Sequence, residues 1–61
     1  MSWKPDYGYP EQYHKDVVEA CVELMGEENR DFFDHQCSYE SHYEEGQTPQ
    51  ECAEAQYEAL T

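Results

Sequence analysis

The sequence predicts an all-α fold, and three stretches of the chain support it. Residues 10–25 gather most of the aliphatic side chains in a helical repeat, and residues 49–60 open with a clear helix start signal. Residues 30–45 carry aromatic side chains at helical spacing. A chain of 61 residues makes one small domain, 1–61, which buries only about 60% of its unfolded surface. We therefore expect a compact three-helix bundle behind an extended aromatic N-terminal arm, residues 1–9.

The expected arm contains proline and glycine, which favour turns over helix. Its aromatic residues are Trp3, Tyr7 and Tyr9. Aromatic side chains on such an arm usually seal the core of a very small domain. Tyrosine beside acidic residues is also favoured as a contact residue in interfaces. The first role is the expectation, and the second stays open.

Residues 10–25 read as the central helix. Apolar side chains form two neighbouring strips, so the helix should be contacted from two sides. Pro10 suits the first helical position, where its missing N–H costs nothing, and Gly26 suits the C-terminal cap. The two strips consist of Tyr13, Val17, Ala20, Cys21 and Leu24, and of Val18, Val22 and Met25.

Residues 30–45 fit two patterns. As a helix, Phe32, Gln36, Tyr39 and Tyr43 share one face. As a strand, residues 33–43 alternate apolar and polar side chains, which would make the fold α+β. The polar set is poor in strand formers, and a lone strand needs a partner. The helix is therefore the expected form, with Asn29 a candidate N-cap.

The last helix should run over residues 49–60. Thr48, Pro49 and Glu51 form a capping box with proline at the first helical position. Small residues further along, such as Ala55 and Ala59, would allow close approach to the central helix.

The charge is strongly one-sided. Fifteen acidic residues face only Lys4, Lys15 and Arg30, which gives a net charge of -12. This balance argues against nucleic acid or an anionic membrane as a direct partner and favours a basic protein. The chain shows neither an apolar run of membrane-spanning length nor a secretory leader. Three cysteines cannot form a complete set of disulfides within one chain, so we expect reduced thiols and a cytoplasmic protein. We also expect a monomer or a small homo-oligomer.

The acidic residues are also patterned. On each of two expected helices, three of them recur at i, i+3 and i+7, so their carboxylates line one face about 5–6 Å apart at Cβ. Such rows approximate the dense charge of a duplex. Like charges at this spacing cost each helix about 0.2–0.5 kcal/mol per pair, and no interleaved lysine relieves them. The candidate partner-binding residues are Asp16, Glu19, Glu23, Glu27, Glu28, Glu40, Glu44, Glu51, Glu54 and Glu58.

In size, net charge and carboxylate rows the chain resembles the small acidic DNA-mimic proteins that phages make against host defences, including anti-CRISPR and anti-restriction proteins. The resemblance implies a non-enzymatic inhibitor that occupies the DNA-binding surface of a host nucleoprotein complex such as a CRISPR effector. It also implies action in the cytoplasm of the host cell. Such proteins share a charge layout and no sequence motif, so no residue role is carried over.

Catalytic and metal chemistry are not expected, and neither is a cofactor. Cys21, Cys37 and Cys52 show no zinc-ligand spacing, although they would form a three-cysteine site if their strips converged. A thiol nucleophile would lack an oxyanion donor and an orienting group.

Two other readings of the composition stay open. The protein is alternatively a structural or assembly subunit that binds a larger complex through its aromatic arm. A high acid content also suits adaptation to high salt, but there Asp would be expected to dominate, and this chain has eleven Glu and four Asp.

Overall fold

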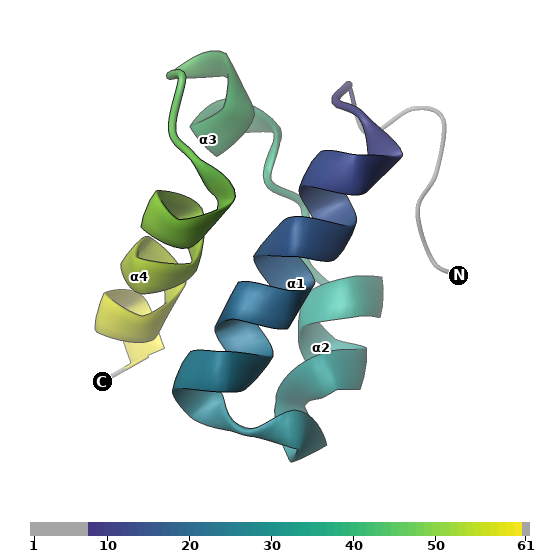
Figure 1. The fold of residues 1–61 in the computed structure, drawn as a ribbon, viewed down its shortest axis with the longest axis vertical. Helices are drawn as coiled ribbons and strands as arrows, with labels where there is room; N and C mark the ends of the chain where they lie inside the picture. The colour runs from purple at the N-terminus through teal and green to yellow at the C-terminus, as the bar shows by residue number, and fades with distance from the viewer. Residues whose placement is uncertain (1–7, 61) are drawn as a thin grey trace.

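The computed structural model describes residues 8–60, and all regular structure in this part of the chain is helical (Figure 1). The all-α class is confirmed. The alternative strand over residues 33–43 is wrong, since that stretch is helix and loop. The elements in order are α1 (Glu11–Met25), the 3-10 turn η2 (Glu27–Asn29), α2 (Arg30–His35), α3 (Glu40–Glu44) and α4 (Pro49–Leu60).

Helix α1 lies between α2 and α4, as its two apolar strips predict (Figure 1). Figure 1 also shows α4 running in the same direction as α1, and α2 running back beside it. The core fills the space between these helices, with α3 near one end. Its buried apolar residues are Tyr9, Val17, Val18, Ala20, Cys21, Phe33, Tyr39, Cys52 and Ala53.

The ends of α1 differ in part from expectation. Pro10 is the N-cap with an extended backbone, one residue before the helix proper. Gly26 caps the other end with a φ of 107°, and its N–H donates to the carbonyl of Val22 at 2.8 Å. Asn29 precedes α2 but makes no side-chain cap there. Its amide instead donates to the carbonyl of Met25 at 2.8 Å, which closes the end of α1.

The single helix expected over residues 30–45 does not form, because the chain leaves the helix after His35 and resumes it at Glu40. Phe33 and Tyr39 are both fully buried, yet six residues on a straight helix would point them about 120° apart. In a continuous helix the Phe33 carbonyl would accept the N–H of Cys37. Here the Tyr39 hydroxyl donates to that carbonyl at 2.6 Å. The break therefore brings both aromatic rings into one core.

The start of α4 confirms the capping box. The backbone N–H of Glu51 donates to the Thr48 hydroxyl oxygen at 3.2 Å, and the N–H of Thr48 donates to the Glu51 carboxylate at 2.9 Å. Two N–H groups that lack helical partners are thereby satisfied.

Of the aromatic residues expected on the arm, Trp3 and Tyr7 lie outside the described residues. Tyr9 is buried against the helices, which agrees with the sealing role for this one position. Among residues 8–60, no helix combines the length and the apolar character needed to cross a membrane.

Candidate functional site

The ten candidate partner-binding carboxylates are all on exposed residues. They come from α1, η2, α3 and α4. On α1, Asp16, Glu19 and Glu23 lie opposite the buried face that carries Val17 and Cys21. On α4, the three glutamates lie away from the buried Cys52 and Ala53. Each row is thus turned outward on its own helix.

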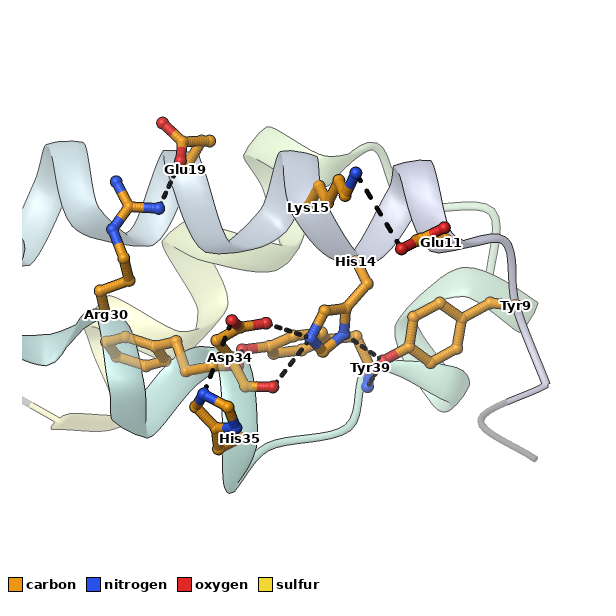
Figure 2. Close-up of polar contacts among 10 residues, drawn as sticks. Tyr9, Glu11, His14, Lys15, Glu19, Arg30, Asp34, His35 and Tyr39 are labelled. Carbon is orange, nitrogen blue, oxygen red and sulfur yellow. Dashed lines mark hydrogen bonds and ion pairs between the residues drawn. The ribbon is translucent and has the colours of Figure 1, made fainter. Parts of the chain in front are cut away.

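Arg30 alters the acidic surface near α1. Its guanidinium donates to the Glu19 carboxylate on α1 (Figure 2). It also donates to the Glu27 carboxylate on η2. Hydrogen bonding to Arg30 lowers the pKa of the Glu27 carboxyl, and bonds to Glu27 and Glu19 raise the pKa of Arg30. Two of the ten carboxylates therefore share one cation. On α1 itself, the Nζ of Lys15 lies 4.0 Å from Oε2 of Glu11.

The acids of α3 and α4 have no such cation. No Lys or Arg occurs after Arg30 in the sequence, and within residues 8–60 the ion pairs of Lys15 and Arg30 all go to α1 and η2. Glu51 serves the capping box, and Glu54 accepts a bond from the Gln50 amide at 3.3 Å. The least compensated negative charge in the described chain is therefore carried by α3 and α4.

A buried polar network links α1 to α2 and was not predicted. His14 is 1% exposed. Its Nδ1 lies 2.8 Å from the Tyr9 hydroxyl, and its Nε2 lies 3.0 Å from the Asp34 carbonyl and 3.1 Å from Asp34 Oδ1 (Figure 2). Tyr9 accepts the N–H of Tyr39 at 3.3 Å. Both partners of Nε2 are oxygen acceptors, which places a ring proton on that nitrogen.

The sequence does contain the signal for this histidine. His14 stands three and four residues before Val17 and Val18 and seven before Cys21, which places it on the same buried face. Because histidine is polar, this spacing was not interpreted as a buried position.

The order hydroxyl, imidazole and carboxylate is also found in catalytic triads. Here Tyr9 is 5% exposed and His14 is nearly inaccessible, so a substrate in solvent cannot reach the hydroxyl. The network instead joins three parts of the chain, namely the residues before α1, α1 itself, and the α2–α3 region. We assign it a structural role.

A second histidine ties α3 to α4. The Nδ1 of His42 lies 2.7 Å from Gln47 Oε1, and its Nε2 lies 3.0 Å from the Gln56 amide nitrogen. The acceptor at Nδ1 and the amide donor at Nε2 place the ring proton on Nδ1. The short helix α3 is thus held against α4 by a side chain on its inner face.

Cys21 and Cys52 are buried in the core, and Cys37 packs against it half-buried. Burial raises the pKa of Cys21 to about 12, with further contributions from Cys52 and Cys37. Burial likewise raises the pKa of Cys52 to about 11 and raises that of Cys37. Among residues 8–60, no three His, Cys, Asp or Glu side chains are arranged to hold a metal ion. These thiols are protonated core groups at neutral pH.

Comparison of the chain with models of protein families, with curated proteins and with solved structures finds no match.

Proposed function

We propose that this protein is an acidic DNA-mimic inhibitor that occupies the basic DNA-binding surface of a host defence nucleoprotein complex, such as a CRISPR effector. One observation carries the proposal: all ten candidate carboxylates are exposed, and those on α3 and α4 have no cationic partner among the described residues.

The position of the cations supports this choice of surface. Arg30 and Lys15 reduce the field around α1 and η2, where Glu19 and Glu27 are engaged. The second half of the chain, from residue 31 onward, contains no Lys or Arg. A basic channel that normally holds DNA phosphates would be attracted to α3 and α4 over long distances at low salt.

The test is competition with DNA. The full chain is immobilised, incubated with a lysate of a candidate host, and eluted first with short duplex DNA and then with NaCl. We expect a DNA-binding complex to be released by duplex DNA, and its affinity to fall steeply as salt rises. Captured proteins that duplex DNA does not release would contradict DNA mimicry.

Charge reversal tests the surface itself. The double variant Glu54→Lys/Glu58→Lys should weaken binding of that complex about 100-fold or more, because like charges then meet across the interface. The matched control Glu11→Lys/Asp31→Lys changes the net charge equally at positions outside the ten and should bind more nearly like wild type. Equal losses in both variants would mean that only net charge matters.

A second candidate is an assembly subunit, because five large apolar side chains are exposed in the described chain. They are Leu24, Phe32, Tyr43, Tyr57 and Leu60. An assembly role predicts that binding survives the Glu54→Lys/Glu58→Lys change and high salt, and that Leu60→Ser weakens it. If an assembly subunit bound its complex through the aromatic arm, Tyr9 would not be a contact residue, because Tyr9 is buried in the core.

A further inference from the structure

Three tyrosines from three different segments pack together at the α3 end of the molecule. The ring centroid of Tyr13 lies 5.7 Å from that of Tyr9 and 5.0 Å from that of Tyr43, and the Tyr9 and Tyr43 centroids are 6.2 Å apart. Tyr13 also donates its hydroxyl proton to the Gln47 carbonyl at 2.9 Å. Tyr43, on α3, remains 41% exposed. One side of its ring is therefore fixed by packing while the rest reaches solvent.

A carboxylate lies on the same face of α3 as this ring. Glu40 precedes Tyr43 by three residues on α3, so the two side chains share a face. The Glu40 carboxylate lies directly against Gly8, at the place where any β-carbon would clash. Gly8 has a φ of +85° and precedes Tyr9 of the aromatic group. Neither of the two described cations pairs with Glu40.

We propose that Tyr43 and Glu40 form an anchor point for an arginine side chain of the basic partner. A guanidinium group lies favourably over a tyrosine ring through cation–π attraction. It can also donate two parallel N–H bonds to the oxygens of a carboxylate. Lysine matches such a paired site less well, because its compact ammonium is strongly hydrated and cannot stack. A tyrosine already fixed by its neighbours loses little conformational entropy when it is covered.

Charge and ring packing together select this position among the exposed apolar residues. Leu24 and Leu60 have no aromatic face, and Phe32 lies on the helix that begins with Arg30. Tyr57 also follows a glutamate by three residues on α4. Tyr43 is chosen because its ring is held by two tyrosines from other segments. Around Tyr43, the charged side chains on α3 are Glu40 and Glu44. This anchor rests on the proposed function, since it assumes a basic protein partner.

The test uses two capped peptides as probes, one of ten arginines and one of ten lysines. Binding to the full chain is measured by calorimetry and by NMR of the tyrosine rings. Wild type should bind the arginine peptide about fivefold more tightly than the lysine peptide, in the range expected for a partly exposed cation–π contact. The ring signals of Tyr43 should shift more than those of Tyr57, which is equally exposed on α4.

Variants separate the anchor from general attraction. Tyr43→Leu and Glu40→Gln should each remove most of the arginine preference, and Tyr43→Phe should keep it because the aromatic face remains. Tyr57→Leu is the matched control and should leave the preference intact. Circular dichroism verifies that each variant is folded, and the wild-type NMR shifts give a reading that needs no substitution.

The outcomes distinguish the two proposals. Salt-dependent binding without arginine preference, or without a shift at Tyr43, would overturn the anchor and leave the acidic surface standing. If neither peptide binds wild type at low salt, the acidic surface and the anchor both fall.

Discussion

The Tyr39 side chain is fully buried, and its hydroxyl donates to the Phe33 carbonyl on α2. Burial raises the pKa of this phenol, with smaller contributions from the nearby cysteines. The group therefore stays protonated and keeps donating to the Phe33 carbonyl. Its ring also lies 5.5 Å from the His14 ring, so one residue joins the helix break to the buried network.

Replacing Tyr39 by phenylalanine tests this bond. Tyr39→Phe keeps the ring but leaves the Phe33 carbonyl without its donor, so we expect a loss of about 1–3 kcal/mol in the free energy of unfolding. Urea denaturation followed by circular dichroism measures it. Tyr57→Phe removes an exposed hydroxyl and should change stability by less than about 0.5 kcal/mol. Similar values for the two variants would show that the Tyr39 bond adds little.

Residue type explains what the sequence did and did not reveal about the site. Exposure of the glutamates follows from their charge and was predicted correctly. The engagement of Glu19 by Arg30 joins residues eleven positions apart on different elements, and a sequence pattern does not encode such a contact. The buried position of His14 was readable from its spacing to Val17 and Val18, but a polar ring is normally assigned to the surface.

At the scale of elements, local signals determined α1 and α4. The apolar repeat of residues 10–25 and the capping box at Thr48 need no information from elsewhere in the chain, and both helices form where expected. The middle of the chain differs because its break depends on Tyr39 reaching Phe33 and Tyr9. Those contacts exist only once α1 is packed, so helical spacing alone gave one helix in place of two.

The capping box gives a prediction for α4. Thr48→Ala removes the hydroxyl that accepts the Glu51 N–H, and should lower the free energy of unfolding by about 0.5–2 kcal/mol. Thr48→Ser keeps the hydroxyl and should restore most of the loss. Thermal unfolding of the three proteins in one buffer provides the measurement. An alanine variant as stable as wild type would mean that α4 is held by packing alone.

At the scale of the whole molecule, a large negative charge surrounds a core rich in ionisable groups that are kept neutral. The pKa of Tyr13 is raised to about 12, chiefly by burial and then by Cys52. With the thiols of Cys21 and Cys52, the core therefore resists ionisation well above neutral pH.

This resistance predicts alkaline sensitivity. Near pH 9 the unfolded chain begins to lose thiol protons that the folded chain retains up to pKa values of about 12 for Cys21 and about 11 for Cys52. The unfolded state then binds fewer protons, so the free energy of unfolding falls as pH rises from about 9 to about 12. Urea titrations across that range measure the slope.

The control for this prediction is the double variant Cys21→Ala/Cys52→Ala. It should be less stable at pH 7, because two buried side chains become smaller, but its stability should fall less steeply above pH 9. A slope identical to that of wild type would assign the alkaline loss to the tyrosines.

Cys52 lies on the buried face of α4. Its thiol can therefore be used to detect local opening of that helix. Cys52 is covered completely, whereas Cys37 is only half-buried. An alkylating reagent should thus modify Cys37 first, and reach Cys52 only when the last helix detaches. The delay between the two modifications, followed by mass spectrometry, measures how often that helix opens without any introduced label.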